Sequence, residues 1–288
     1  MPRLRIRHRT ELRYSGTATE SVNEVRMLPR PGPRVEVEAA EVAVEPATSV
    51  HRHSDSFGNA VTWFQVIEPH DALVVEAEAV VAVRRSLPQA RRTAPEDQWR
   101  ALGDPRYRDD MAEFLAASAY AAADSEVAAL AESLALPESG GVDRWLVDLS
   151  HAVCDAITYD TGATAVHTPA SEVARLRRGV CQDLAHVTIA LCRQRGVPAR
   201  YVSGWLHYLG ANGPGESHAW IEAHVPEDGW VELDPTHPGR SDLDHVPVAV
   251  GRDYSDVPPI RGSYLGAPAS NMTVWVDIRE EPAGPKGP

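Results

Sequence analysis

The sequence Gly-Val-Cys-Gln-Asp-Leu-Ala-His at residues 179–186 predicts the start of a helix that carries a cysteine in its first turn. Apolar side chains recur at positions 180, 184, 187 and 191, which is the spacing of one helical face. Small side chains at positions 181, 185, 188 and 192 form a neighbouring stripe, which would let another element approach the helix closely. Gly196 and Pro198 follow the last turn and are typical of a helix end.

Cys181 therefore lies at a helix start, where free backbone N–H groups and the helix dipole favour negative charge. A thiol in such a position loses its proton more easily, and the thiolate is the nucleophilic form. Cys154 and Cys192 begin no element and belong to no partner pattern, so we expect both to be small buried apolar side chains. Cys181 is the candidate nucleophile.

The composition is that of an ordinary globular protein. Of the 288 residues 43% are hydrophobic and 24% are charged, so the chain can form one large domain or two moderate ones. The formal net charge of −13 argues against nucleic acid or an anionic membrane as a partner, since both bind cationic surfaces. No apolar run is long enough to cross a bilayer, and the N-terminus lacks a signal-peptide core. Three cysteines without framework spacing favour free thiols, so we expect a cytoplasmic protein.

Residues 1–88 are expected to form an N-terminal β domain. Apolar and charged side chains alternate along residues 3–9 and 34–44, and further strands are predicted over 51–55, 61–67 and 73–83. The sequence Ser-Phe-Gly-Asn-Ala at 56–60 is typical of a turn between paired strands. Recurring turns between short strands indicate an antiparallel sandwich or an open barrel. We expect this domain to be structural or to shape the substrate site.

Residues 89–150 are expected to form a helical segment, after a polar connection over 84–97. The pattern turns helical from Asp104, and helical spacing predicts one helix marked by Met111, Phe114, Leu115 and Ala119, a second over 127–134 and a third over 143–157. A short helix over 171–177, capped by Ser171 or Thr168, would lead into the cysteine helix.

Three strands are predicted after Pro198, over residues 199–207, 218–225 and 230–234. A glycine-rich polar loop over 209–217 is the best candidate for a mobile segment near the site. A bulged turn at Gly229 would pair His224 with Trp230 and residue 220 with residue 234. This register would place His218 and Asp234 on one face of the sheet as diagonal neighbours.

Cys181, His218 and Asp234 supply the three groups that nucleophilic cysteine catalysis requires. These groups are a thiolate, a histidine that pairs with it and later donates a proton, and an acid that orients the imidazole.

Three pieces of sequence carry a family resemblance: Gly-Val-Cys-Gln-Asp-Leu-Ala (179–185), Ser-His-Ala-Trp-Ile-Glu (217–222) and Gly-Trp-Val-Glu-Leu-Asp-Pro-Thr (229–236). Together they closely resemble the transglutaminase-like superfamily, and Phe-Gly-Asn (57–59), Glu-Pro-His (68–70) and residues 248–262 extend the resemblance to its bacterial branch. The resemblance implies an α+β fold, in which an N-terminal antiparallel β-sandwich or barrel-like domain precedes a papain-like core of helices packed on an antiparallel sheet. The expected catalytic core spans residues 151–262, residues 263–280 hold a closing strand that returns to the N-terminal sheet, and residues 281–288 form a flexible tail.

The resemblance implies Cys181 as nucleophile, His218 as general base and acid, and Asp234 as the orienting acid. The implied activity ranges from amide or peptide hydrolysis to glutamine–amine acyl transfer through a thioester acyl-enzyme. The chain lacks the extra β-sandwiches of the animal crosslinking enzymes, so water is the expected acceptor. The expected substrate is a peptide, a protein or a small amide, and no cofactor is expected. A catalytically silent peptide-binding scaffold is the alternative from another class.

Several other residues are weaker candidates. We expect the Cys181 backbone N–H to hold the oxyanion, with Gln182 or Trp205 as the second donor. A solvent or structural role is expected for His186 and a surface position for His224. A zinc site on Cys181, His186, His218 and His224 lacks metal-ligand spacing, so no metal is expected. Asp253, Tyr254, Asp256 and Arg261 belong to a loop that is either pinned by salt bridges or lines the substrate groove as a flap. The substrate-binding candidates are Gln182, Trp205, Trp220, Asp253 and Tyr254.

Overall fold

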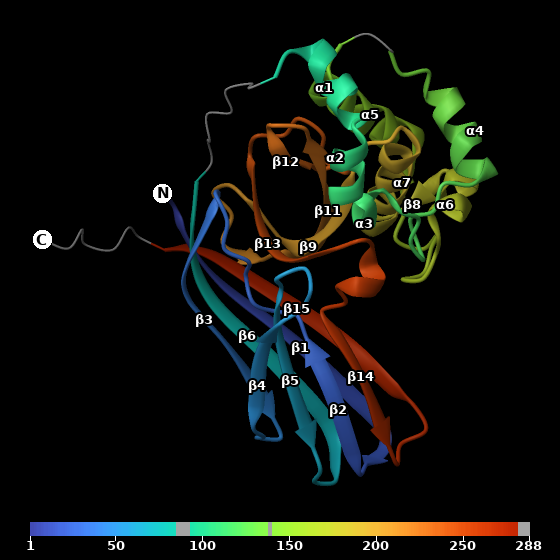
Figure 1. The fold of residues 1–288 in the computed structure, drawn as a ribbon. Helices are drawn as coiled ribbons and strands as arrows, with labels where there is room; N and C mark the ends of the chain where they lie inside the picture. The colour runs from blue at the N-terminus through green and yellow to red at the C-terminus, as the bar shows by residue number, and fades with distance from the viewer. Residues whose placement is uncertain (85–92, 138–139, 282–288) are drawn as a thin grey trace, which may run out of the picture.

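Two antiparallel sheets lie at one end of the molecule, and a smaller curved sheet with a layer of helices lies at the other (Figure 1). The computed structural model describes residues 1–84, 93–137 and 140–281. Within this part of the chain the fold is α+β, with N-terminal antiparallel sheets followed by a core of helices and sheet. The expected fold class is therefore confirmed.

The N-terminal part contains a five-stranded sheet in the order β10-β15-β1-β6-β3 and a four-stranded sheet in the order β14-β2-β5-β4. Alternating apolar and charged side chains on β1 make this strand half-buried, because successive side chains point to opposite faces. The strands are β1 (Arg3–Ala18), β2 (Glu20–Val25), β3 (Val35–Glu45), β4 (Val50–Ser54), β5 (Ala60–Val66), β6 (His70–Val83), β10 (Gly213–Pro214), β14 (Ile260–Leu265) and β15 (Ser270–Glu281).

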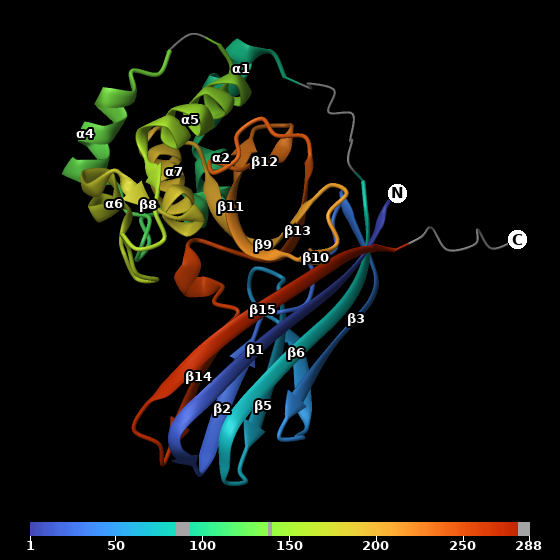
Figure 2. The same ribbon diagram turned by 180° about the vertical axis from the view of Figure 1, so that it is seen from behind.

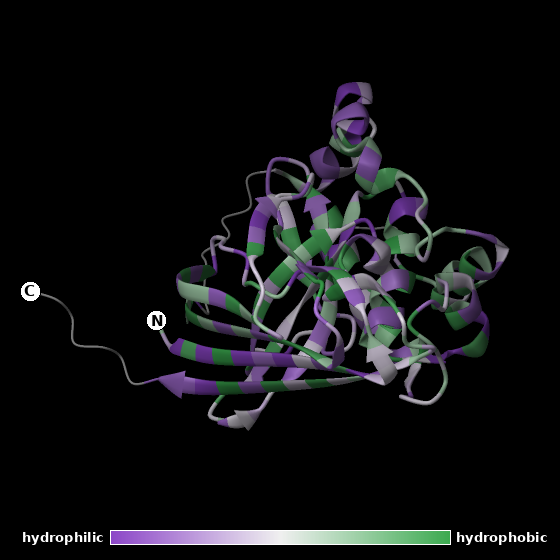
Figure 3. Ribbon diagram, turned by 90° about the horizontal axis from the view of Figure 1, so that it is seen from below, coloured by the Kyte–Doolittle hydropathy of each residue, from purple (hydrophilic) through white to green (hydrophobic). Residues whose placement is uncertain are grey.

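The two faces of β1 differ sharply in environment. Leu4 and Ile6 are completely buried, whereas Arg3 and Arg7 form surface ion pairs with glutamates of β3 and β6 in the same sheet. Figure 3 shows the resulting alternation of hydrophilic and hydrophobic residues along β1 and β15. The buried face supplies most of the stabilisation here, since exposed ion pairs contribute about 0–1 kcal/mol each.

The C-terminal strand β15 returns to the N-terminal sheet and pairs antiparallel with β1, with Ile6 opposite Ile278. The closing strand expected there is confirmed. Both ends of the described chain lie close together at one end of this sheet, where β1 begins and β15 finishes (Figure 1). The tail expected over residues 281–288 falls outside the described residues, apart from its first residue.

The helices follow the sequence prediction in part. The second and third predicted helices are confirmed as α4 and α5. The first predicted helix is present but shorter than its spacing indicates, because α3 ends where Ala116 becomes extended, so Ala119 lies outside it, and Met111 separates it from α2. The predicted cap of α6 is wrong, since Pro169 precedes this helix and no side chain caps it. The helices are α1 (Pro95–Leu102), α2 (Pro105–Asp110), α3 (Ala112–Leu115), α4 (Ser125–Leu134), α5 (Val142–Ala156), α6 (Ala170–Leu176), α7 (Cys181–Gln194) and the 3₁₀ helix η1 (Tyr254–Asp256).

The core sheet has the strand order β12-β11-β9-β13. Figures 1 and 2 show the helices gathered on one side of this curved sheet, and α7 packs directly on β11 and β9. Two more strands, β7 and β8, pair in parallel just before α7. The bounds are β7 (Thr158–Tyr159), β8 (Arg178–Gly179), β9 (Ala199–Tyr208), β11 (Glu216–Val225), β12 (Gly229–Leu233) and β13 (Leu243–Gly251).

The hairpin of β11 and β12 has the predicted register. His224 pairs with Trp230, and Gly229 takes a positive φ of 85° in the turn, as the bulged turn requires. The glycine-rich loop between β9 and β11 contains the short strand β10, which pairs with β15. Among the described residues, no helix combines the length and the apolar composition needed to span a membrane.

Candidate active site

Cys181 is the first residue of α7, as the sequence predicts. Asp183 fixes this helix start, because its Oδ2 accepts hydrogen bonds from the Val180 backbone N–H at 2.8 Å and from the Thr164 hydroxyl at 2.5 Å. Gly179 permits the close approach, since a Cβ at this position would lie 2.7 Å from the Cβ of Asp183. The helix therefore presents a partly buried sulfur at a defined place.

His218 lies on β11 and is only 5% exposed. Its Nε2 is 2.9 Å from Oδ2 of Asp234, which directly follows β12. Cys181 is also near enough to raise the pKa of His218, and Nδ1 is the ring nitrogen that Asp234 leaves open for the sulfur. The structure thus brings together the three residues that the sequence selected.

The pKa of His218 is strongly perturbed. Burial lowers this pKa, but hydrogen bonds to Asp234 and Cys181 and their negative charges outweigh burial and raise it to about 10. For Asp234, burial acts to raise the pKa, but hydrogen bonds from His218, His237 and His245 hold it far below its usual range. An imidazolium beside an ionised carboxylate is the resulting state at neutral pH.

Two more histidines contact the same carboxylate oxygen. Oδ2 of Asp234 lies 2.9 Å from Nε2 of His245 and 3.2 Å from Nδ1 of His237, while its Oδ1 accepts backbone N–H groups of Thr236 and His237. The other ring nitrogen of His245, Nδ1, lies 3.4 Å from Glu232. Glu232 in turn accepts a 2.8 Å hydrogen bond from Arg34 of the N-terminal part. A connected polar network thus extends from the site to the N-terminal part.

His237 and His245 were not among the site residues predicted from the sequence. His237 follows Asp234 by three residues in a turn, and this spacing would have predicted that the two side chains lie close together. His245 lies on β13, a strand that the sequence analysis did not predict, so its side-chain direction was not accessible.

Tyr159 lies near the sulfur of Cys181. Tyr159 is 53% exposed, and its pKa is raised by partial burial and by the charges of Cys181 and Glu216. Its hydroxyl also contacts the backbone N–H of Cys181. The pairing of β7 with β8 explains this position, because it aligns Tyr159 with Gly179 just before the helix.

The expected second oxyanion donors lie elsewhere. The Trp205 indole N–H donates to Nδ1 of His8 at 3.1 Å, in a fully buried contact with the N-terminal sheet, so the expectation that it serves as the donor is wrong. The Gln182 side chain donates to the Ala165 carbonyl at 3.4 Å. Trp220 is fully buried and stacks on the His218 ring, with 6.0 Å between ring centroids, so it packs against this imidazole.

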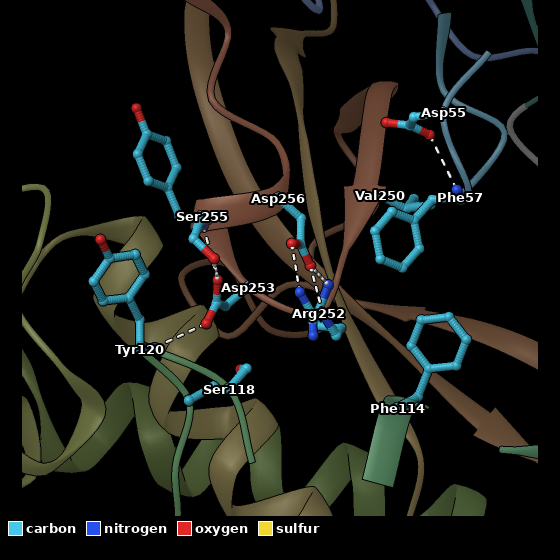
Figure 4. Close-up of polar contacts among 12 residues, drawn as sticks. Asp55, Phe57, Phe114, Ser118, Tyr120, Val250, Arg252, Asp253, Ser255 and Asp256 are labelled. Atoms are coloured by element: carbon cyan, nitrogen blue, oxygen red, sulfur yellow. Dashed lines mark hydrogen bonds and ion pairs between the residues drawn. The ribbon is translucent and has the colours of Figure 1, made fainter. Parts of the chain in front are cut away.

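The loop after β13 is locked in place by its own contacts. Figure 4 shows Asp253 between Tyr120 and Ser255. Asp253 is completely buried, and the backbone N–H of Tyr254 donates to Nε2 of His186 at 3.2 Å. Arg252 and Asp256 form the adjacent ion pair at 2.9 Å. These contacts favour a pinned loop over a substrate flap.

His186 and His224 lie outside the site. His186 is completely buried, and burial lowers its pKa to about 4, so its role is structural. His224 is held by the Tyr107 hydroxyl at 2.8 Å and is partly buried rather than fully exposed. The zinc set considered from the sequence is therefore not assembled. A different group, His218, Asp234 and His245, brings its ligand atoms within 4.8 Å of one another.

Comparisons with known proteins agree with this geometry. Residues 4–82 match the family model of the bacterial transglutaminase-like N-terminal region, and residues 129–235 match that of the transglutaminase-like superfamily. The chain is 35% identical over 283 residues to an uncharacterized protein of Mycobacterium leprae (strain TN), covering 96% of this chain and 99% of that protein. It is 30% identical over 177 residues to a protein-glutamine gamma-glutamyltransferase of Pseudomonas aeruginosa, covering 53% of this chain and 22% of that protein.

A solved structure from Cytophaga hutchinsonii, provisionally described as a cysteine protease, has the same fold. Its TM-score is 0.74 at 20% identity, covering 98% of this chain and 92% of that chain. This likeness concerns the fold alone, and it includes both the N-terminal sheets and the helical core. The chain therefore belongs to the transglutaminase-like superfamily, whose members are usually cysteine enzymes, with the bacterial N-terminal region in front of its core.

Proposed function

We propose that the chain is a cysteine-dependent hydrolase of amide or peptide bonds. The observation that carries the proposal is the position of His218, whose Nε2 lies 2.9 Å from Asp234 and whose pKa is raised by nearby Cys181. An activated thiol needs a neighbouring imidazole, and the imidazole needs a group that fixes its orientation. All three are held by elements of the core, α7, β11 and the end of β12.

Acylation begins when the Cys181 thiolate attacks the carbonyl carbon of the substrate. The carbonyl oxygen takes the negative charge, and we expect the backbone N–H at the start of α7 to stabilise it. The C–N bond then breaks, and protonated His218 gives its proton to the leaving amine. The products of this step are a thioester on Cys181, a free amine and a neutral imidazole.

Deacylation returns the enzyme to its starting state. Neutral His218 accepts a proton from water, and the resulting hydroxide attacks the thioester carbonyl. The C–S bond breaks, so a carboxylic acid leaves while the thiolate and the imidazolium form again. Asp234 stabilises the imidazolium and keeps the ring in place throughout.

Acyl transfer to an amine is the second candidate, and the similarity to the Pseudomonas aeruginosa gamma-glutamyltransferase favours it. An amine would then replace water in the second step, and an amide would form in place of the acid. Adding a primary amine to an active preparation separates the two activities. Conjugate in the mass spectrum identifies transfer, and release of acid alone identifies hydrolysis.

Selective labelling of the three cysteines tests the nucleophile directly. We expect iodoacetamide at pH 7 to alkylate Cys181 at least about 10-fold faster than Cys154, because only Cys181 has an imidazolium partner. His218→Asn should remove this advantage. Cys192 is the internal control, since it is completely buried and burial raises its pKa to about 12. Equal, slow labelling of all three cysteines would favour the catalytically silent scaffold.

Turnover is then measured on a peptide library by mass spectrometry. Cys181→Ala should abolish all cleavage that the wild-type protein shows, while Cys154→Ala should retain it. A Cys181→Ala protein that cleaves at the wild-type rate would refute the proposal.

A further inference from the structure

One carboxylate oxygen, Oδ2 of Asp234, has more imidazole partners than cysteine catalysis requires. Orienting the catalytic imidazole takes one contact, the 2.9 Å approach of His218 Nε2. His245 Nε2 at 2.9 Å and His237 Nδ1 at 3.2 Å are additional. Three ring nitrogens and an anionic oxygen therefore converge on one point, and the proposed hydrolysis leaves two of them without a role.

We propose that His218, His237, His245 and Asp234 form a binding site for one zinc-like transition-metal ion, and that an ion bound there silences the cysteine. Imidazole and carboxylate are ligands that Zn²⁺ and related divalent ions accept readily. The site differs from the metal set considered in the sequence analysis, because it excludes the sulfur. It also lies on the side of His218 that faces away from Cys181.

The ligand atoms of His218, Asp234 and His245 are grouped closely enough to share one ion, and His237 approaches the same carboxylate oxygen from outside this group of three. Bonds of about 2.0–2.1 Å place neighbouring ligand atoms roughly 3.3 Å apart. The nitrogen–oxygen distances around Asp234 are 2.9, 2.9 and 3.2 Å, and the ligand atoms of His218, Asp234 and His245 all lie within 4.8 Å of one another. Small ring movements would bring the two imidazoles of this group to bonding distance.

Further residues contact the proposed ligands and hold them in position, as is usual around a metal ion in a protein. A histidine that binds metal usually donates its other N–H to a carboxylate, which fixes the ring. His245 has a carboxylate on that side, since its Nδ1 lies 3.4 Å from Glu232 as an ion-pair contact, and Arg34 in turn donates to Glu232 at 2.8 Å. The other oxygen of Asp234 is fixed by the backbone N–H groups of Thr236 and His237, so Oδ2 is kept directed toward the rings.

An entry path exists. A cavity of about 410 Å³ lies behind the triad, and Asp234, His237 and His245 all line it. Its remaining lining includes His151 and Arg240. An ion can therefore reach the cluster without passing the sulfur.

Metal binding and catalysis would compete for His218. The ion takes the place of the proton on Nε2, and the displaced protons go to solvent. A ring held by the ion is drawn toward the cavity and cannot exchange protons with the sulfur, so the thiol loses its partner. Removing the ion restores the triad.

The test measures binding of Zn²⁺ to the full-length, metal-free protein by competition with a chromogenic chelator. A Cys181→Ser background is used, so the result does not depend on the proposed hydrolase activity. We expect one equivalent of Zn²⁺ with a Kd of about 1 μM or tighter, and His245→Gln should weaken binding by at least about 100-fold. His151→Gln, which changes another histidine lining the same cavity, should leave the Kd unchanged.

Co²⁺ provides a second measurement on the same proteins. Its visible absorption should indicate tetrahedral nitrogen and oxygen ligands, with no sulfur charge-transfer band in the wild-type protein. If His245→Gln does not fold by circular dichroism, His237→Gln takes its place and should also weaken Zn²⁺ binding. The proposal is overturned if Cys181→Ser binds no Zn²⁺ below about 100 μM, if the histidine variant binds as well as its parent, or if a sulfur band appears.

Discussion

At the scale of single residues, environment separates the three cysteines. Cys192 is completely buried, and the pKa of Cys154 is raised by burial and by nearby acids. Cys181, by contrast, lies at a helix start beside a charged imidazole. The sequence alone made this distinction, because helix spacing and downstream motifs mark position 181. It could not identify Asp183 as the group that fixes the helix start, since that requires knowing which hydrogen bonds form.

Asp183→Ala should destabilise the protein. The substitution removes the acceptor for the Val180 N–H and the Thr164 hydroxyl, and both donors lie in a partly buried setting. We expect the free energy of unfolding to fall by about 1–3 kcal/mol, measured by urea denaturation. Alkylation of Cys181 should also slow, because the helix start is no longer fixed.

Glu126→Ala is the matched control for this change. Glu126 is an exposed acid in the first turn of α4, and its removal should cost at most about 0.5 kcal/mol. An equal loss in both variants would mean that Asp183 acts only through the general helix-end effect.

At the scale of elements, the parts with clear periodicity and turn chemistry were predictable. The cysteine helix and the β11–β12 register were correct, because Gly229 and the alternation of the strands leave one consistent pairing. Strand β13 was missed because Pro247 interrupts its pattern, and the structure accommodates this proline at an irregularity between residues 247 and 249 of an edge strand. The first predicted helix is shorter than its apolar spacing indicates, because Ala116 takes an extended backbone conformation that the spacing does not encode.

Gly204→Ala tests how closely β9 must approach its neighbours. Gly204 lies opposite His218, and a Cβ there would collide with the Trp220 ring and the Val246 carbonyl oxygen. We expect a loss of about 1–3 kcal/mol in unfolding free energy, because neither neighbour in the packed sheet can move freely. Alkylation of Cys181 should slow as well, since Trp220 stacks on His218.

Gly32→Ala is the control for the glycine substitution. No heavy atom lies within 4 Å of a Cβ placed at this position, so the melting temperature should stay within about 1–2 °C of wild type. A Gly204→Ala protein as stable as the Gly32→Ala protein would show that the sheet relaxes around the added methyl group.

At the scale of the whole molecule, the N-terminal sheets and the core share one apolar cluster. Leu4 and Ile6 of β1 and Ile278 of β15 belong to the same buried cluster as Leu184 and Val187 of α7. Polar contacts cross the same boundary. The Asn59 side chain exchanges two 2.8 Å hydrogen bonds with the backbone of Val250, beside Phe57 in Figure 4. The two parts should therefore unfold together.

The hydrogen bond between Trp205 of the core and His8 of the N-terminal sheet should make the stability of the protein sensitive to acid. Nδ1 of His8 accepts the indole N–H, so the ring is neutral, and burial lowers its pKa to about 4 from 6.5. A folded-state pKa below the unfolded value means that the unfolded chain binds more protons between these pH values. The stabilisation from neutral His8 is thus fully present above about pH 6.5 and is lost as the pH falls to about 4. The expected loss is about 3 kcal/mol, and buried His186 acts in the same direction.

Urea denaturation between pH 4 and pH 7 measures this dependence. His8→Gln should be less stable than wild type at pH 7, yet its unfolding free energy should fall less steeply with acid, because the buried neutral imidazole of His8 is gone. His53→Gln, at an exposed position on β4, should keep the wild-type slope. The N-terminal and core transitions should stay coincident in all three proteins. An unchanged slope in His8→Gln would show that protonation of His8 does not limit acid stability, and the boundary would then owe its acid response to other groups.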